Sequence, residues 1–223
     1  MEGASAYLAP VAGSGVWYYG LRGLEEFYEA EEVFRDRGRL DGTKLVLVRY
    51  PDGERFFPLP AKENVTLGAP AFSEGRIGIP ALDHGKGEIT VWLFDPENGG
   101  TLKAAVLPAS DAGDYYNLFL RPSPLTLTQA PARGDFRILW PEKASFPVGD
   151  RESYAFREGE RFYFSEWFED PDYREETVVR DVRGRLLERF RGDVMRMPGG
   201  EIWRLLEDGP EGTEKRENGG NEA

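Results

Sequence analysis

The feature of this sequence that most restricts its fold is a repeated order of strand-like and turn-like segments. The segment that begins at Ala71 is repeated from Ala155, which lies 84 positions later. Each copy opens on Ala-Phe, passes through a glycine-containing turn into an apolar strand, and reaches an aspartate-led turn that ends in glycine. The separation is twice 42, and about 42 residues make one four-stranded blade of a β-propeller. We therefore predict an all-β, propeller-like fold.

The two copies also predict which turns are equivalent. Gly75 and Gly159 follow the Ala-Phe strands and should occupy the same first hairpin turn. Asp95 and Asp181 end the third strand of each copy and should occupy the same later turn, because an aspartate followed by glycine is a strong hairpin signal. Superposition of these pairs is the test of the repeat.

Further copies are less regular. Residues 44–60 match the third and fourth strands of the unit, with residues 15–19 as the preceding strand. Residues 115–141 would form another copy that lacks the regular turns, and residues 193–203 resemble the start of one more. We predict about four blades, with the last strands completing the first blade and closing the ring. A β-sandwich or an open stack of antiparallel sheets is the alternative.

Two segments stand apart from the repeat. Residues 207–223 contain almost no apolar residue, so we predict a disordered acidic tail after a single domain that spans residues 1–206. Residues 24–34 place several large apolar side chains near one helical face, but they could equally form a hairpin. We favour strand here because the neighbouring segments are strands, and a short helix remains the alternative.

Composition excludes several classes of function. The chain holds 40 acidic and 28 basic residues, a net charge of −12, which disfavours binding to nucleic acid and to anionic membranes. The absence of cysteine excludes disulfides, thiolate metal sites and a cysteine nucleophile. We predict no cofactor and no metal site. The amino terminus lacks the pattern of a signal peptide and no apolar run is long enough to span a membrane, which predicts a cytoplasmic protein.

Three stretches resemble a family of uncharacterised (hypothetical) bacterial proteins that share a β-propeller-like pattern. They are residues 116–128, 138–146 and 165–181, and the resemblance extends over most of residues 67–206. It implies a propeller-like fold. No activity and no site residues follow from it.

Catalytic candidates are few. His84 is the only histidine and the only available base for a Ser–His–Asp triad, but no nucleophile elbow accompanies it, so we predict a solvated turn residue. The densest acidic run, residues 166–176, includes Glu166 and Asp170, which could serve as paired carboxylates of a carbohydrate-active hydrolase or lyase. A solvated loop whose acids pair with Arg174 and Arg180 is the plainer interpretation.

Aromatic and polar residues at the ends of the expected strands are the better candidates for a binding surface, because the loops of successive blades converge on one face of a propeller. The residues that we single out are Tyr115, Asn117, Arg121, Trp140, Glu166 and Trp167. Packing between blades is the alternative role for these side chains. The leading functional prediction is a non-catalytic binding or scaffold module for a protein or small-molecule partner, and the carbohydrate-active enzyme is the runner-up.

Overall fold

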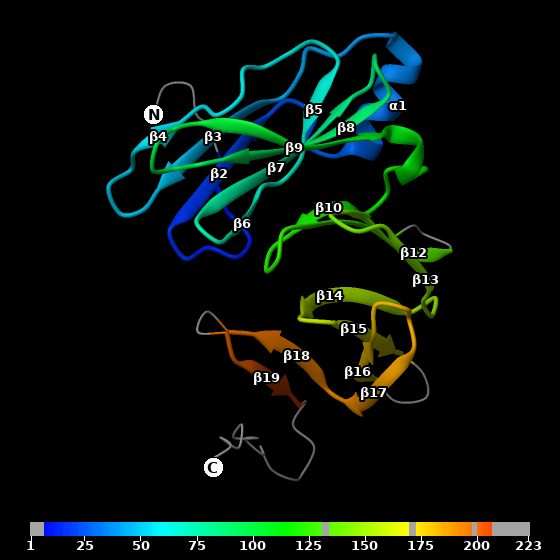
Figure 1. Ribbon diagram of the computed structural model, residues 1–223. Coiled ribbons are helices and arrows are strands. Elements are labelled where there is room, and N and C mark those ends of the chain that lie inside the picture. Colours follow the sequence, from blue (N-terminus) through cyan, green and yellow to red (C-terminus); the bar gives the residue numbers. More distant parts are fainter. Residues whose placement is uncertain (1–6, 131–133, 170–172, 198–199, 207–223) are drawn as a thin grey trace. The chain divides into compact units, whose positions relative to one another are not determined.

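The computed structural model describes residues 7–130, 134–169, 173–197 and 200–206. The chain forms two compact units, Met1–Pro147 and Val148–Ala223. Figure 1 shows both as successive small antiparallel sheets. The single domain over residues 1–206 stays a prediction, and the predicted tail lies outside the described residues.

The first sheet of the first unit has four antiparallel strands in chain order, β1-β2-β3-β4. A helix, α1, separates β2 from β3 in the sequence. The bounds are β1 (Ala9–Pro10), β2 (Trp17–Arg22), α1 (Phe27–Arg37), β3 (Lys44–Arg49) and β4 (Arg55–Phe56).

The second sheet has an interrupted inner strand. Two short strands, β5 (Val65–Leu67) and β6 (Ala71–Ser73), pair with opposite ends of β7 (Arg76–Asp83). Between them the N–H of Gly68 donates a 2.9 Å hydrogen bond to the carbonyl of Pro80, which keeps the broken strand against β7. The sheet continues through β8 (Glu88–Phe94) to β9 (Thr101–Pro108), so it matches a four-stranded unit with a divided first strand.

The third sheet completes the first unit. A short 3₁₀ helix (Ala109–Ala112) precedes β10 (Leu118–Arg121), β11 (Thr126–Gln129), β12 (Asp135–Trp140) and β13 (Ala144–Pro147), which pair in that order.

The second sheet is apolar on both faces because both faces are covered. Ile77, Ile79 and Ala81 share one core cluster with side chains of β2 and β3. Leu82 and its neighbours on β8 share another cluster with side chains of β10, β11 and β12. Side chains alternate along a strand, so the nearly unbroken apolar run of β7 supplies both clusters at once.

The second unit contains one four-stranded sheet and one hairpin. The sheet runs in the order β14 (Glu152–Glu158), β15 (Arg161–Phe168), β16 (Arg174–Arg180) and β17 (Leu186–Arg191), and the hairpin joins β18 (Asp193–Arg196) to β19 (Ile202–Leu205). Tyr163 and Val179 on the sheet pack against Val194 and Ile202 of the hairpin. The hairpin therefore covers one face of the sheet.

These sheets confirm the prediction of an all-β, propeller-like fold with about four consecutive blade-like units. The predicted turn equivalences are also confirmed. Gly75 joins β6 to β7 and Gly159 joins β14 to β15, both with positive φ, at 77° and 56°. Asp95 follows β8 and Asp181 follows β16, and each carboxylate accepts a 2.9 Å hydrogen bond from the backbone N–H two residues later.

Two expectations are wrong. The last strands do not complete the first sheet: β18 and β19 pair with each other, while the first sheet takes its four strands from residues 9–56. Residues 27–37 form a helix rather than a strand. A helix is favoured here because Phe27 and Ala30, three residues apart, lie on the same helical face and are both buried. Gly38 also ends it in the left-handed conformation, with its N–H bonded to the Phe34 carbonyl at 2.7 Å.

Within the part of the chain that the structure describes, no helix is both long and apolar enough to cross a membrane.

Candidate binding pocket

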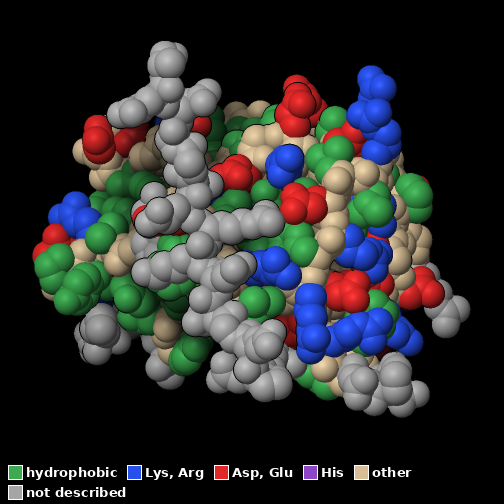
Figure 2. Space-filling model, turned by 90° about the horizontal axis from the view of Figure 1, so that it is seen from below, with side chains coloured by type: hydrophobic (Ala, Val, Ile, Leu, Met, Phe, Trp, Pro, Cys, Tyr) green, Lys and Arg blue, Asp and Glu red, His purple; other side chains and the backbone are tan. Residues whose placement is uncertain are grey.

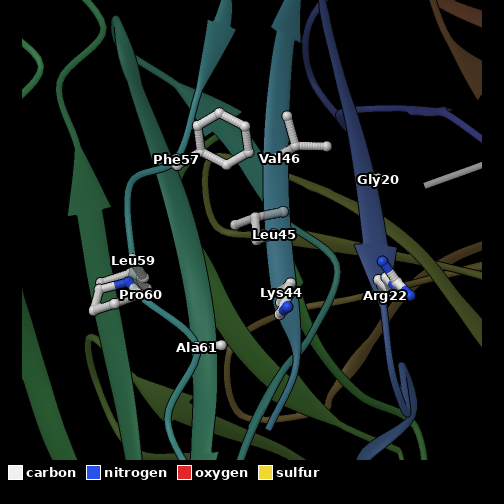
Figure 3. A pocket seen from close by; sticks show the side chains of 9 residues that line it. All are labelled: Gly20, Arg22, Lys44, Leu45, Val46, Phe57, Leu59, Pro60 and Ala61. Atoms are coloured by element: carbon white, nitrogen blue, oxygen red, sulfur yellow. The ribbon is translucent and has the colours of Figure 1, made fainter. Parts of the chain in front are cut away.

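A pocket of about 200 Å³ lies at one end of the first sheet. Strands β2 and β3 form its floor, and the segment between β4 and β5 forms its side wall (Figure 3). The residues that line it are Gly20, Arg22, Lys44, Leu45, Val46, Phe57, Leu59, Pro60 and Ala61. At about 30 Å³ per water, the space would hold roughly seven water-sized groups, so it suits a small ligand.

The two ends of this pocket differ in chemistry. Phe57 and Val46 lie toward one end, and the cationic side chains of Arg22 and Lys44 lie toward the other (Figure 3). Phe57 is 62% exposed although it is a large aromatic residue, whereas Val46 is buried. An exposed ring beside a hollow offers a surface against which a flat apolar group could stack. The pocket is therefore amphipathic.

The two cations of the pocket lie next to each other on adjacent strands. Arg22 at the end of β2 is the direct antiparallel partner of Lys44 at the start of β3. No ion pair or hydrogen bond among the described residues involves either side chain. Lys62 lies just beyond the lining residue Ala61, but its ammonium group bonds Asp83 Oδ2 at 2.8 Å. Two open positive charges therefore remain at this end of the pocket.

The local chain path explains how these two residues meet. Residues 23–43 leave the sheet after β2 and return at β3, with α1 between them. Gly42 on the return has φ of 78°, and its Cα lies so close to the carbonyl of Lys62 that a Cβ there would collide with that oxygen. The close approach of Gly42 to Lys62 holds the start of β3, in the pocket floor, beside the wall formed by residues 57–61.

A second hollow, of about 280 Å³, lies over β12 and β13. Its lining includes Asp111, Arg137 and Lys143. The ammonium of Lys143 already bonds Asp111 Oδ2 at 2.7 Å, so part of its charge is satisfied within the protein. The pocket of the first sheet is the better candidate because neither of its cations has such a partner among the described residues.

Four of the six residues singled out from the sequence lie on or beside the third sheet. Tyr115 and Asn117 precede β10, with positive φ of 59° and 50°, while Arg121 ends β10 and Trp140 ends β12. Because β10 and β11 are antiparallel, as are β11 and β12, Arg121 and Trp140 lie toward one end of the sheet and Asn117 toward the other. These four residues therefore do not meet in one place.

Three of these side chains have packing partners in the protein. Tyr115 and Trp140 are partly buried against the cluster shared by the second and third sheets. Burial raises the pKa of the Tyr115 hydroxyl, and the negative charge of Glu31 raises it further. The guanidinium of Arg121 lies over the ring of Phe119, 4.8 Å from its centre. Their role in binding a ligand stays a prediction.

The other two residues lie on β15 in the second unit. Trp167 is 45% exposed, whereas the carboxylate of Glu166 accepts a 2.6 Å hydrogen bond from Arg189 Nη1. Asp170, the expected partner of Glu166 in a carbohydrate-active site, lies outside the described residues. None of the six residues lines the pocket of the first sheet.

His84 is not the solvated turn residue that we predicted. Its side chain is fully buried at the β7–β8 turn, with Nδ1 2.9 Å from Glu31 Oε2 and Nε2 3.0 Å from Thr66 Oγ1. The ring of Phe34 lies 5.5 Å from the imidazole. The prediction failed because the helix that supplies Glu31 and Phe34 was itself not expected. The imidazole fastens α1 to β5 and the β7–β8 turn.

A hydroxyl, an imidazole and a carboxylate bonded in this order also make up catalytic triads. Whether Thr66, His84 and Glu31 could act as one depends on whether a substrate can reach the Thr66 hydroxyl. Thr66 is only 1% exposed and is packed inside the first unit. A nucleophile must reach a substrate within bonding distance, and a hydroxyl enclosed in this way cannot. The three groups satisfy one another inside the protein, as buried polar groups must.

Several charged side chains elsewhere on the surface are paired within the protein. On the face shown in Figure 2, basic and acidic side chains are interspersed with hydrophobic ones. Arg174 and Arg189 both bond Glu176, and the Arg174 bond lowers the pKa of that carboxyl most. For Asp83, partial burial alone would raise the pKa, but the hydrogen bonds from Lys62 and from the N–H of Lys86 outweigh it and lower the pKa.

Within the described ranges, no cluster of three or more histidine and acidic residues could hold a metal ion.

Comparison with known proteins assigns no family. No protein-family model matches the chain, and no curated protein matches it. Among solved structures, it is similar to a chain of the crystal structure of Porphyromonas gingivalis dipeptidyl peptidase 4, with 10% identity and a TM-score of 0.42. The similarity covers 83% of this chain and 31% of that chain, so this protein spans about a third of the other. Nothing about activity is concluded from a similarity of this extent.

Proposed function

We propose that the protein is a non-catalytic binding module that takes a small ligand into the pocket at the end of the first sheet. The observation that carries the proposal is the pocket itself, which combines an exposed aromatic ring, a buried aliphatic floor and two cations that have no bonding partner in the described part of the chain. Apolar walls with a few convergent polar groups are the usual make-up of a ligand site. The resemblance to hypothetical bacterial propeller-like proteins is compatible with this proposal and implies no ligand.

The runner-up, a carbohydrate-active hydrolase or lyase, has less support. Retaining and inverting glycosidases both need two carboxyl groups that face the same bond, one of them free to act as an acid. Glu166 instead shares Arg189 with Glu176, its direct partner on β16. That arrangement places both carboxylates in ion pairs with Arg189.

The proposal is tested by nuclear magnetic resonance on the full chain with three matched probes, namely benzoate, benzamide and benzylamine. We expect at least one probe to shift the backbone amide signals of Gly20 and Val46. Substitution F57A should weaken that binding about threefold or more, because it removes the exposed aromatic wall. Substitution F119A, at another exposed phenylalanine of the same unit, should leave it unchanged. If none of the three probes shifts these amides, the pocket is not a ligand site and the proposal is wrong.

A further inference from the structure

We propose that the ligand of this pocket is a small carboxylate, with its anionic group between Arg22 and Lys44 and a compact apolar body against Phe57, Leu59 and Val46. This inference rests on the proposed function, because it names the chemical class of the ligand at the same site. The physical basis is the electrostatics of one strand pair.

Arg22 and Lys44 are like charges at directly opposite positions of an antiparallel pair. Like charges placed this way destabilise a sheet, because the two side chains leave the same face only a few ångströms apart. In a protein with 40 acidic and 28 basic residues, acidic partners are plentiful elsewhere. The absence of one at this pair, within the described ranges, leaves room for an anion from outside the chain.

The second unit shows how the same problem is solved internally. Glu166 on β15 and Glu176 on β16 are also like charges at directly opposite positions. There Arg189 of β17 reaches both carboxylates through one nitrogen, Nη1, at 2.6 and 3.2 Å. The protein thus supplies its own counter-ion to one such pair, whereas the described residues supply none to the pair at the pocket. We infer that a bound anion neutralises Arg22 and Lys44, as the cation of Arg189 neutralises Glu166 and Glu176.

The remainder of the pocket excludes a purely inorganic anion as the best ligand. Val46 is two residues along β3 from Lys44, so its side chain leaves the same face of the sheet. Phe57 and Leu59 stand beside it on the opposite wall (Figure 3). Phosphate or sulfate would leave the exposed ring of Phe57 and the half-buried Leu59 in contact with water, while an apolar body attached to the anion would cover them. A guanidinium and an ammonium group both suit a carboxylate as partner.

The same three probes test the inference, with inorganic phosphate as a fourth. Benzoate should bind about tenfold or more tightly than benzamide, which has the same ring but no charge, and benzylamine should not bind. Phosphate alone should bind more weakly than benzoate. Benzoate binding should weaken between low and high salt, since both cations are exposed and screened by ions.

Two single variants locate the effect. Substitutions R22Q and K44Q should each lower the affinity for benzoate several-fold and leave that for benzamide unchanged. The matched control is K103Q, because the ammonium of Lys103 lies over the ring of Trp92 and does not line the pocket. Neither R22Q nor K44Q should lower the midpoint of thermal unfolding, since each relieves the like-charge pair.

The outcomes separate the two proposals. If benzamide and benzoate bind this pocket equally, or if phosphate binds as tightly as benzoate, the carboxylate inference is wrong and the binding site stands. If no probe perturbs the amides of Gly20 and Val46, both are wrong. A loss of benzoate binding in K103Q as large as in R22Q would also overturn the inference, because the effect would then come from the general charge of the protein.

Discussion

The Nδ1 atom of His84 lies 2.9 Å from Oε2 of Glu31, and this contact fastens α1 to the turn between β7 and β8. Helix α1 lies in the connection between β2 and β3, the two strands that carry Arg22 and Lys44. The imidazole is fully buried and the Glu31 side chain is 25% exposed, so the contact lies at the edge of the core, where a hydrogen bond is stronger than in water.

Substitution H84A should therefore destabilise the first unit. The Glu31 carboxylate would keep its 3.8 Å ion pair with Arg35, but it and the buried Thr66 hydroxyl would both lose their hydrogen bond to the imidazole. This loss should cost about 2–3 kcal/mol of unfolding free energy. Urea denaturation measures the loss, and hydrogen exchange should show that the amides of α1 lose protection.

The control for this prediction is E32Q. Glu32 lies next to Glu31 on the same helix, but its carboxylate is exposed and bonds only the Tyr28 hydroxyl, at 2.9 Å. Its substitution should change the unfolding free energy by about 0.5 kcal/mol or less. If H84A proved as stable as E32Q, the buried contact would not be what holds the helix.

A second prediction concerns Glu152 at the start of β14. Its carboxylate is 2% exposed and is held by both arms of the Arg180 guanidinium, at 2.6 and 2.8 Å, and this bond raises the pKa of Arg180. Substitution E152A leaves a partly buried cation without its partner and should cost about 3 kcal/mol. Denaturation of the variant, followed by the fluorescence of the tryptophans, measures this.

The comparison is E188A. Glu188 faces Arg161 at 3.8 Å with both side chains largely exposed, so its loss should cost about 0.5 kcal/mol or less. Equal effects of E152A and E188A would show that burial adds nothing to the Glu152–Arg180 pair.

The repeat could be read from the sequence because its turns are made by local chemistry. Asp95 and Asp181 each bind the backbone two residues later, and Gly75 and Gly159 each supply a positive φ. Such turns need no knowledge of distant residues. Helix α1 could have been recognised in the same way, from the spacing of Phe27 and Ala30 and from Gly38 as its end.

The pocket could not be predicted in this way. Arg22 and Lys44 are 22 positions apart, and they become partners only because an intervening helix leaves the sheet and β3 returns in one particular register. A shift of one residue would place them on different faces of the sheet. The partners of His84 were missed for the same reason, since Glu31 and His84 meet only through tertiary packing.

A third prediction concerns acid. The hydrogen bond from Arg174, together with that from Arg189, lowers the pKa of Glu176 below its usual value of 4.5. A carboxyl whose pKa is lower in the folded state stabilises the protein above its unfolded pKa, and this contribution is lost as the pH falls through the folded pKa. Wild type should therefore be more stable than E176Q at pH 7, and the gap should close as the pH falls below about 4.5.

Denaturation at a series of pH values measures the gap, and E160Q at an exposed turn is the control that should show none. A gap between wild type and E176Q that stayed constant down to pH 3 would mean that the ion pairs with Arg174 and Arg189 contribute nothing in solution.

The last prediction compares alanine substitutions at two glycines of the first unit, both of which have a left-handed backbone conformation. Gly42 and Gly53 have φ of 78° and 74°, and alanine at either position bears the cost of this conformation, about 1–2 kcal/mol. At Gly53 nothing lies within 4 Å of an added Cβ, whereas at Gly42 the Cβ would collide with the carbonyl of Lys62. G42A should therefore be less stable than G53A by a further 1–3 kcal/mol or so, because backbone cannot move aside as a side chain can.

Gly42 also packs the segment before β3 against Lys62, next to the pocket wall. The two substitutions should therefore differ in their effect on ligand binding as well. With G42A the wall must shift to relieve the collision, and benzoate binding should weaken, while G53A should bind benzoate as the wild type does. Thermal unfolding and the amide shifts of Gly20 and Val46 measure the two effects on the same samples. If G42A and G53A were equal in both, the close approach of Gly42 to Lys62 would not shape the pocket.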